Sequence, residues 1–202
     1  MQLKIGLFFG SFNPVHVGHL VLANYMLEFT ELDRIWFVIS PHNPLKEKVS
    51  LLKENHRLQM VRIAISESSK MKASNVEFKL PQPSYTVNTL AHLTENFPNH
   101  NFSLIMGADN LQSLTKWKNY EYILKHHKIF VYPRPGSDGG ELKVHPSIHF
   151  TEAPVVELSS TFLRKAVAEK KDIRHFLPAG VWEYLKEMNF YKKINGKTVT
   201  RQ

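Results

Sequence analysis

The sequence predicts an α/β fold: a single doubly wound parallel sheet with helices on both faces and a helical segment at the C-terminal end. Two observations predict it. The 202 residues fit one domain with one core. Short apolar runs alternate with segments whose apolar residues recur at helical spacing, and no internal repeat is present. Ligands of such sheets bind beyond the carboxyl ends of the strands, so the turns that follow strands are where a site is expected.

The individual elements follow from these runs and from the glycine and proline residues between them. Strands are expected at residues 3–9, 34–40, 75–80, 102–106, 128–132 and 148–151. Helices are expected at residues 20–27, with a helical turn before them, and at 56–65, 86–97, 117–124, 160–169 and 181–188. Residues 1–191 form one expected domain, and the polar residues 192–202 are expected to be a mobile tail.

The composition narrows the classes of partner. Lysine and arginine number 26 against 18 aspartate and glutamate residues, and the net charge of +8 favours anionic partners. Because the basic residues are scattered, small phosphorylated substrates are favoured over nucleic acid. The absence of cysteine excludes disulfides and thiolate nucleophiles. The sequence shows neither an export signal nor an apolar span, so a cytoplasmic location without a membrane partner is expected.

The turn after the first expected strand carries the strongest chemical signal. Residues 10–19 read Gly-Ser-Phe-Asn-Pro-Val-His-Val-Gly-His and lead into the first helix. The N–H groups at a helix N-terminus, together with the positive end of its dipole, bind anions. His16 and His19 are three residues apart, so in a helical turn their side chains point the same way. The turn therefore predicts a phosphate site.

A second segment of similar chemistry lies near the C-terminal end. Residues 158–164 read Leu-Ser-Ser-Thr-Phe-Leu-Arg at the start of an expected helix. Hydroxyls, N–H groups and a guanidinium on one helical turn can bind a second phosphate. The structural alternative is that Ser159 or Ser160 serves only as the helix N-cap.

Together the two segments resemble the His-x-Gly-His and Ser-Ser/Thr-Thr-x-x-Arg signatures of the nucleotidyltransferase superfamily. Within it, the first segment is most similar to the bacterial nicotinate-nucleotide adenylyltransferase family. The resemblance implies a Rossmann-like fold and transfer of the adenylyl group of ATP to nicotinate mononucleotide, in NAD biosynthesis. Mg²⁺ on the triphosphate would supply positive charge to such a reaction, and because the sequence shows no dedicated cluster of carboxylates, the metal is expected to be carried with ATP. The sequence departs from the family at Phe9, commonly glycine, and at Asn88, usually aspartate.

The resemblance also implies roles for individual residues. The expected catalytic residues are His16, His19 and Arg164. The expected ATP-binding residues are Gly10, Ser11, Phe12, Gly18, Lys46, Gly107, Asp109, Ser160 and Thr161. The expected acceptor-binding residues are Asn13, Tyr85, Thr86, Trp117 and Arg134.

Several of these positions also have a structural interpretation. Asp109 follows an expected strand, where a carboxylate either accepts hydrogen bonds from ribose hydroxyls or caps the next helix. Trp117 lies among polar residues, which favours stacking on a flat ring over a place in the core. Lys46 and Arg134 lie on expected loops, where a basic side chain reaches either a phosphate or only solvent.

Two other functions stay open at the level of sequence. The same scaffold suits adenylyl or cytidylyl transfer to another acceptor, such as nicotinamide mononucleotide or phosphopantetheine. The net charge of +8 also suits a non-catalytic protein that binds nucleotides or nucleic acid. Either way, a homo-oligomer is compatible with the sequence.

Overall fold

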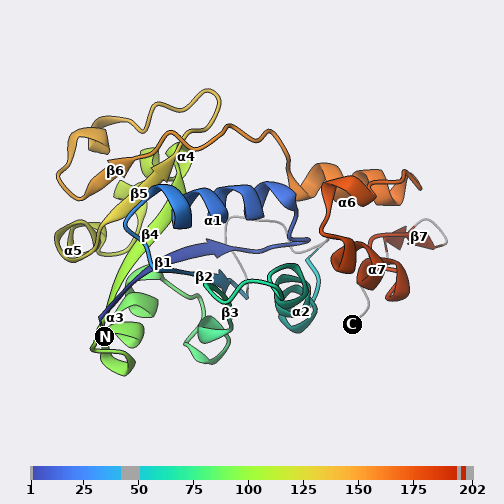
Figure 1. The fold of residues 1–202 in the computed structure, drawn as a ribbon, viewed down its shortest axis with the longest axis horizontal. Coiled ribbons are helices and arrows are strands. Elements are labelled where there is room, and N and C mark those ends of the chain that lie inside the picture. Colours follow the sequence, from blue (N-terminus) through green and yellow to red (C-terminus); the bar gives the residue numbers. More distant parts are fainter. Residues whose placement is uncertain (1, 42–50, 195–196, 199–202) are drawn as a thin grey trace.

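The computed structural model describes residues 2–41, 51–194 and 197–198. Its centre is a six-stranded parallel sheet in the order β3-β2-β1-β4-β5-β6 (Figure 1). The sheet is doubly wound, as the sequence predicts. Its strands are β1 (Leu3–Gly10), β2 (Arg34–Ile39), β3 (Met71–Ser74), β4 (His100–Gly107), β5 (Ile129–Tyr132) and β6 (Ile148–Phe150).

Helices cover both faces of the sheet. They are α1 (Val17–Phe29), α2 (Glu54–Ala64), α3 (Thr86–Asn96), α4 (Ala108–Gln112), α5 (Tyr120–His126), α6 (Ser160–Ala168) and α7 (Ala179–Glu187). Single 3₁₀ turns are η2 (Val76–Lys79), η3 (Leu114–Lys116), η4 (Glu141–Val144) and η5 (Arg174–Phe176). Near the C-terminal end, β7 (Lys193–Ile194) pairs antiparallel with β8 (Lys197–Thr198).

Two hydrophobic clusters, one on each face, hold these layers together. Successive strand residues point to opposite faces, so Phe8 and Phe37 join one cluster while Leu7 and Trp36 join the other. Helices α1, α2, α6 and α7 bury their apolar sides in the first cluster, and α3, α4 and α5 in the second. Figure 1 shows α1 and α3 on opposite sides of the sheet.

The order of the strands places a crevice at the centre of the sheet. The chain runs outward from β1 to β2 and β3, then returns to pair β4 with the other side of β1. The direction of winding therefore reverses between β1 and β4, the position where doubly wound sheets bind ligands. The segments that follow Gly10 and Gly107, at the carboxyl ends of these strands, flank that crevice.

The strand predicted at residues 75–80 is wrong. The third strand is Met71–Ser74, and the 3₁₀ turn Val76–Lys79 follows it. The short alternation that suggested a strand has another origin, because Val76 packs on the second hydrophobic cluster and Phe78 on the first. Glu77, which a half-buried strand would expose, is 3% exposed.

The helix predicted at residues 117–124 begins later. Asn119 has a φ of 52°, in the left-handed region, and α5 starts only at Tyr120. Asparagine enters this region more readily than most residues, which explains the break. Trp117 is consequently held on an irregular segment between η3 and α5.

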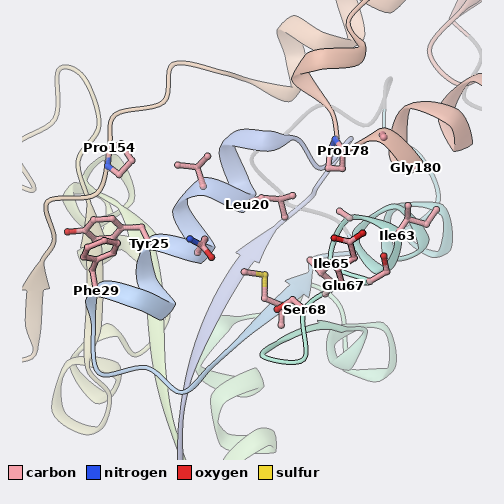
Figure 2. A pocket seen from close by; sticks show the side chains of 16 residues that line it. Leu20, Tyr25, Phe29, Ile63, Ile65, Glu67, Ser68, Pro154, Pro178 and Gly180 are labelled. Carbon is pink, nitrogen blue, oxygen red and sulfur yellow. The ribbon is translucent and has the colours of Figure 1, made fainter.

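A groove of about 830 Å³ lies along the outer side of α1. Its walls come from α1, the turn after α2 and the start of α7, and Figure 2 shows Leu20, Ile63 and Pro178 at its sides. None of the expected site residues that the structure describes lines it. Among the helices of the described segments, none is long and apolar enough to cross a membrane.

Candidate active site

The turn between β1 and α1 is built around a buried phenylalanine. Phe12 has a φ of 45° and is 2% exposed, and its ring lies 5.1 Å from that of His19, centroid to centroid. A Cβ on Gly10 would lie 2.8 Å from the Phe12 ring, so glycine leaves the space that this ring fills. The Phe12 side chain therefore supports the turn, and only its backbone is available to a phosphate.

His16 and His19 lie side by side at the start of α1, as their spacing predicts. Their ring centroids are 3.7 Å apart, with an angle of 33° between the planes. The N–H of His16 donates to Nδ1 of His19 at 3.2 Å, and the N–H of His19 donates to the His16 carbonyl at 2.9 Å. These two bonds hold the first turn of the helix closed around the pair.

The bond to Nδ1 determines the tautomer of His19. A ring nitrogen that accepts a hydrogen bond carries no proton, so in the neutral imidazole the proton is on Nε2. His19 is thereby prepared as a hydrogen-bond donor through Nε2. An N–H donor in this position suits the oxygens of a phosphate.

His16 is held in the neutral form. It is 5% exposed, and its Nδ1 has no hydrogen-bond partner among the described residues. Burial, and to a smaller extent the positive charge of Arg134, lowers the pKa of His16 from 6.5 to about 4. A Cβ on Gly18 would lie 3.1 Å from His16 Nδ1, so this glycine leaves room beside the ring.

The lowered pKa of His16 predicts a pH-dependent stability. Between pH 6.5 and about 4 the unfolded chain binds a proton at His16 and the native state does not. The free energy of unfolding should therefore fall as the pH is lowered through this window, by at most about 3 kcal/mol from this residue. In urea titrations at pH 7 and pH 5, the variant His16→Asn should lose less stability than the wild type. The variant His175→Asn, which replaces an exposed histidine, should lose as much stability between pH 7 and pH 5 as the wild type. Equal losses for all three proteins would contradict the assignment.

Helix α6 brings the second phosphate segment to the same turn. Ser160 Oγ donates to the carbonyl of Pro14 at 2.9 Å, and Arg164 Nη1 donates to the carbonyl of Asn13 at 2.9 Å. Arg164 Nη2 also donates to Thr161 Oγ1 at 3.2 Å. The two segments that the sequence predicts as phosphate sites are thus in contact.

The cap of α6 belongs to the neighbouring serine. Ser159 Oγ accepts a hydrogen bond from the N–H of Phe162 at 3.2 Å, which makes Ser159 the N-cap. Ser160 therefore does not serve as the cap, and its hydroxyl bonds to the N-terminal turn instead.

A third group of site residues follows β4 and β5. Arg134 Nε lies 3.8 Å from Asp109 Oδ1, and its guanidinium lies 5.2 Å from the centroid of the Tyr132 ring. A Cβ on Gly107 would lie 2.9 Å from Arg134 Cγ, so glycine permits this close packing. The structure places Arg134, expected at the acceptor, beside Asp109 and within electrostatic range of His16.

The segments expected at the acceptor lie near one another. Tyr85 and Thr86 stand at the N-terminus of α3, and Lys118 Nζ lies 4.7 Å from the centroid of the Tyr85 ring. This contact joins the start of α3 to the segment that holds Trp117. The Trp117 side chain is half-buried and packs on the second hydrophobic cluster, which leaves part of the indole exposed.

Comparison with known proteins identifies the family. A family model described as cytidylyltransferase-like matches residues 7–166. A Flavobacterium johnsoniae protein named "Probable nicotinate-nucleotide adenylyltransferase" is 58% identical over 193 residues, 95% of this chain and 100% of the relative. A protein of the same name from Bacteroides thetaiotaomicron is 47% identical over 186 residues, 92% of each chain. The chain belongs to the nicotinate-nucleotide adenylyltransferase family.

Solved structures support the fold of this family member. The Plasmodium falciparum nicotinic acid mononucleotide adenylyltransferase complexed with NaAD is similar to it, with a TM-score of 0.76. The match covers 94% of this chain and 98% of that one, at 22% identity. The predicted Rossmann-like doubly wound sheet is thereby confirmed.

The two departures from the family lie outside the turn. Phe9 is half-buried and packs on the second hydrophobic cluster, on the face of the sheet opposite Phe8. Asn88 is exposed on α3. Neither side chain enters the turn between β1 and α1.

Some site residues have positions that the sequence does not reveal. Asn13, expected at the acceptor, is 3% exposed, and its Oδ1 accepts from Tyr191 Oη at 2.6 Å and from the N–H of Leu52 at 3.3 Å. Its side chain therefore holds the turn to the C-terminal part of the fold. Lys46 lies outside the described residues. The sequence does not single out Arg57 either: α2 also carries Glu54 and Arg62, so nothing in the residue pattern marks Arg57 as the buried one.

Proposed function

We propose that this family member joins the adenylyl group of ATP to nicotinate mononucleotide and releases deamido-NAD and pyrophosphate. The observation that carries the proposal is the contact between the two phosphate segments, made by Ser160 with Pro14 and by Arg164 with Asn13. It lies at the crevice of the sheet, in a chain 58% identical to a protein named for this activity. A site built from two such segments can stabilise the negative charges of two phosphorylated substrates.

The reaction needs no covalent intermediate of the enzyme. A phosphate oxygen of nicotinate mononucleotide attacks the α-phosphorus of ATP, and the bond from that phosphorus to the oxygen bridging to the β-phosphate breaks. Pyrophosphate leaves with the electron pair. The attacking phosphate is already an anion, so the enzyme supplies orientation and positive charge rather than a strong base.

The residues of the turn would bind the triphosphate. The Nε2–H of His19 donates to a phosphate oxygen. The neutral ring of His16 packs against the His19 ring and keeps that ring in place. The guanidinium of Arg164 offsets the negative charge that builds on the departing pyrophosphate. Asp109 is placed to accept hydrogen bonds from the ribose.

Magnesium would enter as part of the substrate MgATP. The described residues contain no group of three or more histidine, aspartate or glutamate side chains that could hold a metal ion. The described residues therefore fit a cation that is bound mainly by the triphosphate. Such a cation would lower the charge repulsion between the two substrates.

The start of α3 and the exposed part of Trp117 would bind the acceptor. The first N–H groups of a helix suit a carboxylate. Helix α3 opens with Thr86, and the cationic Lys118 lies against the ring of the preceding Tyr85. An indole face suits a flat pyridine ring. This arrangement favours an acceptor that carries a negative group on its ring.

An acceptor panel tests the proposal. Magnesium with ATP or CTP is combined with nicotinate mononucleotide, nicotinamide mononucleotide or phosphopantetheine, and pyrophosphate release and product mass are measured. ATP with nicotinate mononucleotide should give the highest kcat/KM, by at least about tenfold over the amide acceptor. A preference for the amide, for CTP or for phosphopantetheine would replace the proposed substrate. No turnover with any pair would reject the enzymatic function.

A further inference from the structure

Arg57 lies behind the phosphate-binding turn, on α2. It is 0% exposed and is among the largest fully buried side chains of the described residues. Its helix packs on the side of the sheet where β2 ends. A buried arginine outside the expected site is unusual enough to require an explanation, because removing its charge from water is costly.

The guanidinium of Arg57 donates to four main-chain carbonyls. Nε bonds to Leu52 at 2.8 Å, and Nη2 bonds to Pro41 at 2.8 Å. Nη1 bonds to Ser11 at 2.8 Å and to Ser40 at 2.7 Å. One side chain thus joins the segments that leave β1 and β2 with the entry to α2.

Arg57 keeps its charge in this position. Burial lowers its pKa to about 10, with the charge of Glu54 acting in the opposite direction. At neutral pH it is therefore a cation. Its four hydrogen-bond acceptors in the described part of the chain are uncharged carbonyls, so they offset its positive charge only in part.

The bond to Ser11 determines how the turn presents its backbone. In a trans peptide the N–H points away from the C=O, so the Phe12 N–H is directed away from Arg57. A cation at the carbonyl also polarises the peptide and makes that N–H a stronger donor. Two further carbonyls of the turn are held from α6, at Asn13 by Arg164 and at Pro14 by Ser160.

We propose that Arg57 is a positioning residue for adenylyl transfer: it orients and polarises the Ser11–Phe12 peptide that faces the triphosphate. With Arg164 it holds the turn between α2 and α6. Arg57 acts through the backbone and does not itself touch the substrate. The inference rests on the proposed function, because the triphosphate is the ligand that the oriented N–H would meet.

The test compares Arg57→Met, which keeps an unbranched apolar stem without the guanidinium and its charge, with Arg57→Lys. For Arg57→Met we expect kcat to fall roughly 10- to 100-fold, with the KM for nicotinate mononucleotide within about twofold of the wild type. Arg57→Lys should recover part of kcat. The matched control is Arg62→Met, an exposed arginine on the same helix, which should behave as the wild type.

A second readout separates positioning from a structural role. Affinity for the magnesium complex of α,β-methylene-ATP, measured by calorimetry without acceptor, should fall about tenfold or more in Arg57→Met while far-UV circular dichroism stays native. Should Arg57→Met fail to fold, Arg57→Lys decides by the same titration. Unchanged kcat and nucleotide affinity in a folded variant, even with a lower Tm, would overturn the proposal. Failure of the proposed function would instead appear as wild-type protein that binds the analogue but turns over no acceptor.

Discussion

Replacing His19 by alanine is expected to lower kcat for adenylyl transfer by about 100-fold or more, the typical cost of removing one donor from a charge-stabilising site. The Nδ1 of His19 accepts from the His16 N–H, so its Nε2–H is the donor that the variant lacks. The loss should appear in kcat more than in the KM for nicotinate mononucleotide. Steady-state rates of pyrophosphate release measure both.

Two further variants control the His19 experiment. His19→Gln retains an N–H donor on a flat side chain and should keep more activity than His19→Ala. His175→Ala removes an exposed histidine from η5 and should leave the rate unchanged. A natively folded His19→Ala protein with near-normal turnover would remove His19 from the mechanism.

Replacing Arg164 by methionine is expected to reduce kcat/KM for ATP by about 100-fold or more. The variant loses the cation that we propose at the triphosphate, and it loses the hydrogen bond that holds the Asn13 carbonyl. Burial lowers the pKa of Arg164. The ordinary pKa of arginine is so far above neutral pH that the side chain nevertheless remains charged. Arg164→Lys keeps the charge but not the two-armed geometry, so it should recover activity only in part.

The neighbouring Lys165 provides the matched control. Its exposed side chain lies 4.0 Å from Glu169 on the surface of α6, away from the turn, and Lys165→Met should retain the wild-type rate. Comparable losses in the Arg164 and Lys165 variants would indicate that general damage to α6, rather than the guanidinium, causes the effect.

The parts of the fold that the sequence predicts are those with a local cause. The strands around Phe8 and Leu104 carry continuous buried and mostly apolar stretches, because they are central in a sheet covered on both faces. The edge strand Met71–Ser74 is half-exposed and short, so its apolar pattern is weak. The alternation after it belongs to a 3₁₀ turn whose side chains divide between two cores.

The candidate site shows the same division. The chemistry of the N-terminal turn can be read from its residues, since a helix start with two histidines suits a phosphate whatever surrounds it. The direction of each side chain cannot. Asn13 turns inward because Tyr191, 178 residues further along the chain, donates to it. Arg134 joins Asp109 because β4 and β5 pair in parallel and bring their ends together.

The sequence by itself determined the alternating elements, the two phosphate segments and the family. These depend on turn chemistry, helix starts and apolar spacing, which act over a few residues. Only the tertiary structure decided which groups hold the turn in shape: Arg57 from α2, Arg164 from α6 and Tyr191 near the C-terminal end. Their hydrogen bonds exist only after distant segments have packed, so no local pattern in the sequence records them.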